Sequence, residues 1–288
     1  MAAPAEGPVV VLAGGGGLPT ILIEALDRSG RQRRVIAFRG FADRGVRMRA
    51  DAAIDLLDVA GGLALLERWK PAAVVLAGAV TRPSPAAFLG ALSALRNRSE
   101  LSRLMARGDD HLLRAVVETI EERGYRVVGA HEIAPDLIAP PGTLGAVAPD
   151  DEARAAIAVG FACLADLSPF DIGQALVVQG ERVVAIEGAE GTDRMLARVG
   201  SLRGGFIFSR RRETGAILVK SAKQGQERRV DLPTIGPRTM RKAAAAGLAG
   251  VAVGAGQTII VEREATISEA DRLGIFLVGI EPAARRDS

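Results

Sequence analysis

The 288-residue sequence has few of the residues that build disulfides and zinc sites. It contains one cysteine, Cys163, and two histidines, His111 and His131. One cysteine excludes an internal disulfide framework and a thiolate zinc site, and two histidines exclude a zinc site built mainly on imidazole. Any metal should therefore be held by oxygen ligands, which favours magnesium or manganese.

Aromatic residues, excess charge and long apolar runs are also scarce. Aromatics make up 3% of the chain, and 37 basic against 34 acidic residues leave a formal net charge of +3, so nothing indicates nucleic-acid binding. The apolar runs, such as Val9–Ala13, are strand-sized, whereas a membrane span needs about 20 apolar residues. We expect no transmembrane segment, no signal peptide and a cytoplasmic protein.

Apolar runs and amphipathic stretches alternate through the first half of the chain. This alternation predicts parallel βαβ units in a Rossmann-like α/β sheet. Ligands of such sheets bind beyond the carboxyl ends of the strands, so the loops at 14–17 and 78–85 are candidate binding loops. The predicted strands cover residues 9–13, 34–38, 53–56, 73–77 and 125–128.

A stretch rich in proline and glycine, residues 134–149, interrupts this pattern and is predicted to be a linker. It separates an N-terminal domain, residues 1–133, from a C-terminal domain, residues 150–288. In the second half, two apolar runs flank residues 179–182, which is typical of a β-hairpin. Further short strands alternate with helices there, so the second domain is expected to be mixed α/β.

The four glycines at 14–17 follow the first predicted strand and precede a helix. Backbone amides in such a loop, together with the helix dipole, form an anion site. The loop lacks the spacing of the dinucleotide fingerprint, and a sterically tight turn is the alternative interpretation. Arg82, in the second loop, could grip a phosphate or be an ordinary surface arginine. The candidate binding residues of the two loops are Gly14, Gly15, Gly16, Gly78, Ala79, Val80 and Arg82.

Two stretches in the second half combine acids with glycine. In 187–193, three acids and Thr192 could hold a divalent cation or contact ribose, or could simply cap a helix. In VDLPTIG, residues 230–236, Asp231 could bind metal or take a proton from water, or be a plain loop carboxylate. A carboxylate near cations suits a metal-assisted reaction at phosphate, although such a cluster is usually a solvated face. The cations upstream are Lys220, Lys223, Arg228 and Arg229.

Seven motifs together resemble the family of LpxI-type UDP-2,3-diacylglucosamine pyrophosphatases of lipid A biosynthesis. Each motif is weak alone, but their order and spacing hold over nearly the whole chain. One departure is that residues 84–86 lack an acid expected after Pro83. The motifs are AGGG at 13–16, AG and TRP within 77–83, RGDD at 107–110, GAHE at 129–132, DIGQ at 171–174, EGTD at 190–193 and VDLPTIG at 230–236.

The resemblance implies a magnesium-dependent hydrolase that cleaves UDP-2,3-diacylglucosamine to UMP and 2,3-diacylglucosamine 1-phosphate. It implies two domains that enclose the lipid-linked substrate, water attack at the β-phosphorus, and an essential carboxylate at Asp231. We expect a homodimer, transient contact with the inner-membrane surface and no nucleic-acid partner. The candidate magnesium ligands are Asp231, Glu190, Asp193 and Asp171. The further candidate substrate contacts are Gln174, Thr192, Lys220, Lys223 and Thr234.

Two other functions stay open on the sequence. The βαβ start could belong to a nicotinamide-dependent enzyme of nucleotide sugars, but the fingerprint fails. Arg39 also follows the second strand, where an acid would normally hold the ribose, although an arginine there could contact a 2′-phosphate. A non-catalytic carrier of the same nucleotide sugar or lipid is the second alternative. Asp231 beside the basic cluster argues against it, because a carrier would not need that carboxylate.

Overall fold

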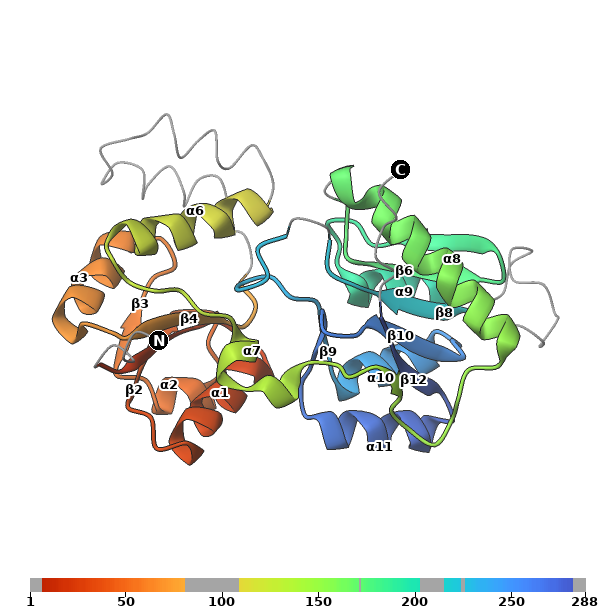
Figure 1. Ribbon diagram of the computed structural model, residues 1–288, viewed down its shortest axis with the longest axis horizontal. Coiled ribbons are helices and arrows are strands. Elements are labelled where there is room, and N and C mark those ends of the chain that lie inside the picture. Colours follow the sequence, from red (N-terminus) through yellow and green to blue (C-terminus); the bar gives the residue numbers. More distant parts are fainter. Residues whose placement is uncertain (1–6, 81–108, 171, 203–214, 224–225, 282–288) are drawn as a thin grey trace. The chain divides into compact units, whose positions relative to one another are not determined.

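The computed structural model describes residues 7–80, 109–170, 172–202, 215–223 and 226–281 (Figure 1). The chain forms two compact units. The first comprises Met1–Pro135 and Glu227–Asp231, and the second comprises Asp136–Gln226 and Leu232–Ser288. The expected α/β architecture, with a parallel sheet first and a mixed sheet second, is confirmed.

The first unit is built on a fully parallel sheet with the strand order β3-β2-β1-β4. Central strand β1 is buried along its whole length, as expected for a parallel strand covered on both faces. Helices α3 and α6 share an apolar cluster on one face, and α1 contacts β1, β2 and β4 (Figure 1). The strands are β1 (Val9–Ala13), β2 (Arg33–Phe38), β3 (Ala52–Ile54) and β4 (Ala73–Ala77). The helices are α1 (Gly17–Arg28), α2 (Arg44–Met48), α3 (Val59–Trp69), α6 (Asp109–Glu122) and α7 (Ala130–Ile133).

The second unit contains a mixed sheet in the order β5-β12-β10-β8-β6-β7. Strands β12, β10 and β8 are parallel to one another, whereas β6 runs antiparallel to β8 and forms the predicted hairpin with β7. A small parallel sheet pairs β9 with β11. The strands are β5 (Gly142–Thr143), β6 (Ala175–Gln179), β7 (Arg182–Ile186), β8 (Ile217–Lys220), β9 (Thr234–Ile235), β10 (Gly250–Gly254), β11 (Ile259–Ile260) and β12 (Phe276–Ile280).

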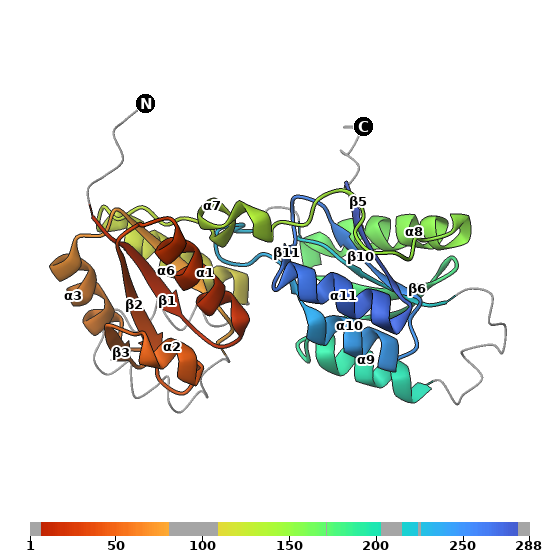
Figure 2. The same cartoon turned by 90° about the horizontal axis from the view of Figure 1, so that it is seen from below.

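Alternating residues of the mixed sheet point into two separate apolar clusters. Leu218 faces the cluster formed with α9, α10 and α11, while its neighbours Ile217 and Val219 face α8. The sheet is therefore covered on both faces, by α8 on one and three helices on the other (Figure 2). The helices are α8 (Asp151–Leu167), α9 (Thr192–Ser201), α10 (Pro237–Ala245) and α11 (Arg263–Leu273), with short 3₁₀ turns at Pro135–Leu137 and Ser168–Phe170.

The structure groups two segments differently from the predicted domain boundaries of 1–133, 134–149 and 150–288. Most of the expected linker belongs to the second unit, because β5 pairs antiparallel with β12. The segment Glu227–Asp231 belongs to the first unit, although it lies far beyond the expected linker. Asp231 therefore groups with the first unit by its contacts, although it follows the expected linker in sequence.

One helical stretch of the described residues, Asp151–Phe170, is long and apolar enough to cross a membrane by length and composition alone. The expectation that apolar segments would all be strand-sized does not hold for it. Only 22% of its apolar window is buried. Ala156, Ile157 and Leu164 nevertheless pack on the mixed sheet, as in the covering helix of an α/β unit.

Candidate functional site

The two glycine loops of the first unit meet at the carboxyl ends of β1 and β4. Gly15 and Ala79 exchange backbone hydrogen bonds of 2.8 and 2.9 Å, and the amide of Gly14 donates to the carbonyl of Ala77 at 2.8 Å. A Cβ at Gly14 would lie 2.6 Å from the Ala79 carbonyl oxygen. Gly78 has φ +90°, and a Cβ there would lie 2.5 Å from the Gly15 carbonyl oxygen. Close backbone approach therefore requires glycine at these positions.

The amides of Gly14, Gly15 and Gly16 all have acceptors within the protein. The amide of Gly16 donates to the carboxylate of Asp43 at 3.1 Å, next to the start of α1. An anion would have to displace those acceptors to take these amides, and the close backbone approach supports the tight-turn interpretation, so binding by Gly14 and Gly15 stays a prediction. Gly16, Gly78, Ala79 and Val80 are exposed, and their contact with a ligand stays a prediction. Arg82 lies outside the described residues.

Three predicted binding residues converge in the second unit. Gln174 precedes β6 and Lys220 ends β8, and these strands are hydrogen-bonded neighbours. The backbone of Gln174 accepts a 3.0 Å hydrogen bond from the amide of Ser221. The ammonium group of Lys220, whose residue is 9% exposed, donates to the hydroxyl of Thr192 at 3.0 Å. The start of α9 and the end of β8 are thus joined through a cation and a hydroxyl.

Glu187, directly after β7, completes this network; it is one of the three acids of the 187–193 stretch, although it was not among the candidate magnesium ligands. Its carboxylate accepts hydrogen bonds from the Thr192 hydroxyl at 2.8 Å and from the Gln174 amide at 3.2 Å. A Cβ at Gly173 would lie 2.3 Å from the Glu187 carbonyl oxygen, so the DIGQ glycine permits this close packing. The network holds the Lys220 ammonium, the natural partner for an anionic ligand, in a fixed place.

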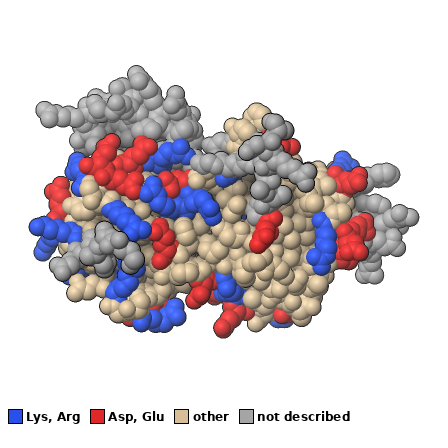
Figure 3. All heavy atoms as spheres, in the orientation of Figure 1, with Lys and Arg blue, Asp and Glu red and all other residues tan. Residues whose placement is uncertain are grey.

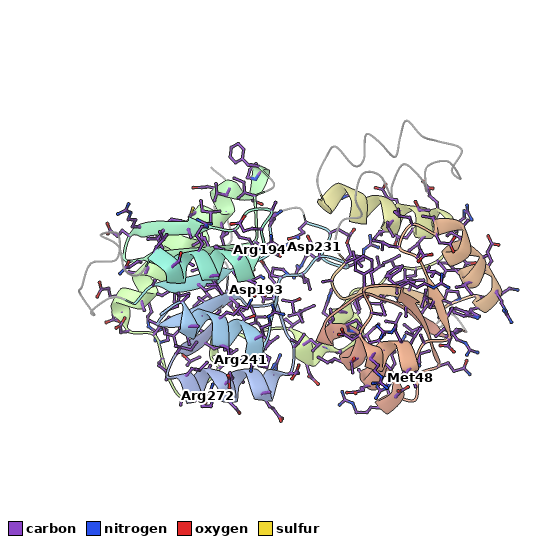
Figure 4. The ribbon with its side chains drawn as sticks, turned by 180° about the vertical axis from the view of Figure 1, so that it is seen from behind. Met48, Asp193, Arg194, Asp231, Arg241 and Arg272 are labelled. Atoms are coloured by element: carbon purple, nitrogen blue, oxygen red, sulfur yellow. The ribbon has the colours of Figure 1, made fainter. Side chains whose placement is uncertain are left out.

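Glu190 and Asp193 are engaged with cations of their own unit. Glu190 pairs with Arg198 at 3.0 Å, and hydrogen bonds from its own backbone amide and then from Arg198 hold the pKa of Glu190 below its usual range. Asp193, which lies on α9 (Figure 4), pairs with Arg238 and Lys242 of α10, each at 2.7 Å. These two carboxylates therefore pair with cations in this structure.

The predicted set of four magnesium ligands stays a prediction. Within the described ranges, no group of three His, Cys, Asp or Glu side chains could hold a metal ion. Asp171 lies outside the described residues. Asp231 stays a candidate ligand, since Mg²⁺ can be bound by one or two carboxylates together with substrate phosphates.

Asp231 ends a turn formed by Glu227–Asp231. The amides of Val230 and Asp231 both donate to the carbonyl of Glu227 at 3.1 Å. After Asp231, the motif continues into β9, where the exposed Thr234 donates its hydroxyl to the carbonyl of Leu232 at 3.2 Å. The motif thus joins a turn of the first unit to a strand of the second unit.

Within the basic cluster upstream of Asp231, the charge of Arg229 is balanced by two carboxylates. Its guanidinium binds both carboxylate oxygens of Glu227 at 2.8 Å and contacts Glu121 at 2.5 Å. The hydrogen bonds that Arg229 donates to Glu227 and then to Glu121 raise the pKa of Arg229. The backbone amide of Lys223 donates to the side chain of Gln226 at 2.9 Å. Acids and bases also mix over the first unit in Figure 3, which agrees with the low net charge.

These features define an α/β protein of two units, with a Rossmann-like parallel sheet, a mixed sheet and an aspartate motif at the chain passage between them. Family models of the LpxI N-terminal domain and the LpxI C-terminal domain match residues 8–137 and 140–278. The UDP-2,3-diacylglucosamine pyrophosphatase LpxI of Caulobacter vibrioides is 38% identical over 275 residues, which cover 96% of this chain and 98% of that protein. The chain belongs to the LpxI family, and the resemblance drawn from its motifs is confirmed.

Proposed function

We propose that the protein hydrolyses the pyrophosphate bond of UDP-2,3-diacylglucosamine in lipid A biosynthesis. The observation that carries the proposal is the full-length match: both family models fit in order, and a relative with 38% identity is named for this activity. The products would be UMP and 2,3-diacylglucosamine 1-phosphate. In the reaction, water oxygen bonds to one phosphorus, the bridging oxygen leaves with the other phosphate, and one proton is released.

Asp231 is the carboxylate that we assign to turnover. It either accepts the proton of the attacking water or shares in binding a cation at the phosphates. The backbone hydrogen bonds of its turn support this role, because a catalytic carboxylate must be held in place. Lys220, held by Thr192 and Glu187, would neutralise phosphate charge.

Magnesium dependence belongs to the proposal. When bound, Mg²⁺ would neutralise charge on the pyrophosphate oxygens. Among the described candidates we propose Asp231 as a ligand, and the substrate phosphates would supply further oxygens. We further propose a cytoplasmic homodimer that contacts the inner-membrane surface transiently to reach its diacylated substrate; sedimentation with and without phospholipid vesicles tests both points.

The first experiment incubates the purified protein with UDP-2,3-diacylglucosamine, in magnesium or in EDTA, and measures UMP. We expect the wild type to release UMP in magnesium but not in EDTA. Asp231→Ala should release no UMP in either condition and should still bind the substrate. Substrate retention without UMP from the wild type would favour a carrier. In ¹⁸O-labelled water, label in the sugar phosphate would show attack at the β-phosphorus, and label in UMP would show attack at the α-phosphorus.

A further inference from the structure

The turn that ends at Asp231 is fastened to the first unit by three contacts outside the turn itself. Val230 packs against the apolar cluster formed by β-strands, α3 and α6. The side chain of Arg229 contacts Glu121, which lies near the end of α6 and precedes it by 108 residues. The backbone of Arg229 also passes close to Gly129. A Cβ at Gly129 would lie 3.3 Å from the Arg229 Cα atom, so the chain passes there with little room.

The ion-pair triad of Glu121, Arg229 and Glu227 joins this anchor to the backbone that carries Asp231. Arg229 grips Glu227 with two parallel hydrogen bonds, a geometry that fixes both direction and distance. The carbonyl of the same Glu227 accepts the amide of Asp231 at 3.1 Å. The side chains of Arg229 and Glu227 are only 31% and 18% exposed, so the contact is partly shielded from solvent.

We infer that Glu121 and Arg229 are positioning residues for Asp231. The Arg229–Glu227 ion pair, called the clasp below, holds the turn together, and Glu121 fixes this ion pair to α6. The Asp231 carboxylate is thereby held in one place. The inference deepens the proposed function and rests on the assignment of Asp231 to turnover. It gives Arg229 a role other than phosphate binding, because its donors are directed to carboxylates.

Steady-state kinetics of Glu121→Gln and Arg229→Gln test this inference. We expect kcat to fall about tenfold in each variant while KM changes less than about twofold, because the reacting geometry is altered and the binding contacts are kept. The double variant should be no slower than Arg229→Gln alone, since both residues act through one contact. Glu67→Gln is the matched control: it removes a surface pair with Arg123, just beyond the end of α6, that does not contact the turn.

Glu121→Gln keeps the Arg229–Glu227 clasp intact, so it tests positioning even where Arg229→Gln folds poorly. Wild-type kcat in both variants, with Asp231→Ala inactive, would overturn the inference alone. So would a loss of rate that disappears once rates are normalised to folded enzyme measured by circular dichroism. Absence of UMP from the wild type, or full activity of Asp231→Ala, would instead overturn the proposed function.

Discussion

Thr192 is the central residue of the hydrogen-bond network formed with Lys220 and Glu187 in the second unit. Its hydroxyl accepts from Lys220 and donates to Glu187, so one oxygen links a nearly buried cation to a carboxylate. A buried ammonium group is costly without partners, and the network supplies one at 3.0 Å. The position and charge of Lys220 are therefore set by a residue that opens the neighbouring helix.

Two substitutions of Thr192 distinguish the contribution of its hydroxyl from that of its methyl group. Thr192→Val keeps the shape but removes both hydrogen bonds, and we expect KM for UDP-2,3-diacylglucosamine to rise about tenfold. Thr192→Ser keeps the hydroxyl and should stay within about threefold of wild type. Equal KM values for the two variants would show that the hydroxyl does not hold Lys220 for the substrate.

Gly78 provides a residue-scale test of the glycine loops. Gly78→Ala combines positive φ with a Cβ 2.5 Å from a carbonyl oxygen, so we expect a loss of about 2–4 kcal/mol in unfolding free energy. Gly30→Ala is the control, because φ is +66° there but nothing lies within 4 Å of the added Cβ, and its loss should be about 1 kcal/mol. Urea denaturation measures both losses, and similar values would argue against the steric reason for Gly78.

At the scale of elements, runs of several apolar residues predict strands and helices better than two-residue segments do. The apolar run at 73–77 coincides with β4, and the hairpin at 175–186 has the expected form. Apolar spacing indicates a helix over 63–69, but α3 begins at Val59, because the Asp58 carboxylate accepts the amide of Gly61 and caps the first turn. Strand β5 has two residues and no periodicity, so its pairing with β12 could not be predicted.

The sequence could indicate candidate site residues within one short motif, but it could not indicate contacts between residues that lie far apart in the chain. Thr192 and Lys220 were chosen separately, and their hydrogen bond depends on the antiparallel pairing of β6 with β8, which the pattern did not specify. Glu187 lay inside an acidic stretch, and its place directly after a strand was the one available signal. Asp193 was chosen for its charge, but a carboxylate cannot be assigned to metal or ion pair without knowing that α10 lies beside it.

The contact between α9 and α10 predicts a structural role for Asp193. Asp193→Asn removes the charge that pairs with Arg238 and Lys242, and we expect a loss of at most about 1 kcal/mol because these side chains are partly exposed. The magnesium concentration for half-maximal UMP release should not change. A higher magnesium requirement in this variant would return Asp193 to the ligand set.

At the scale of the whole molecule, the acid–base properties of the Asp231 turn link activity to stability. Hydrogen bonding from Arg229 holds the pKa of Glu227 below its usual value. A carboxyl whose folded-state pKa is depressed stabilises the folded protein above its unfolded pKa and loses that contribution as pH falls through the folded pKa. The turn should therefore stay intact at neutral pH and weaken in acid below the ordinary range of glutamate.

Arg229→Gln removes the cause of this shift, so it should begin to unfold at a higher pH than the wild type during acid titration followed by circular dichroism. Glu67→Gln is again the control, because its pair with Arg123 is exposed and long, at 3.4 Å. If both variants follow the wild-type acid transition, the clasp contributes no stability that depends on pH.

The chain order of the Arg229–Glu121 contact has a consequence for biosynthesis. A ribosome releases α6 long before it makes Arg229, which follows Glu121 by 108 residues. A nascent chain that has not yet reached Asp231 has an incomplete first unit and lacks the proposed catalytic carboxylate. Domains that form during translation usually close with local contacts, whereas this one waits for a distant segment. If Asp231 is the catalytic carboxylate, hydrolysis becomes possible only late in synthesis, and a translation product that ends before Arg229 would not act on the lipid precursor.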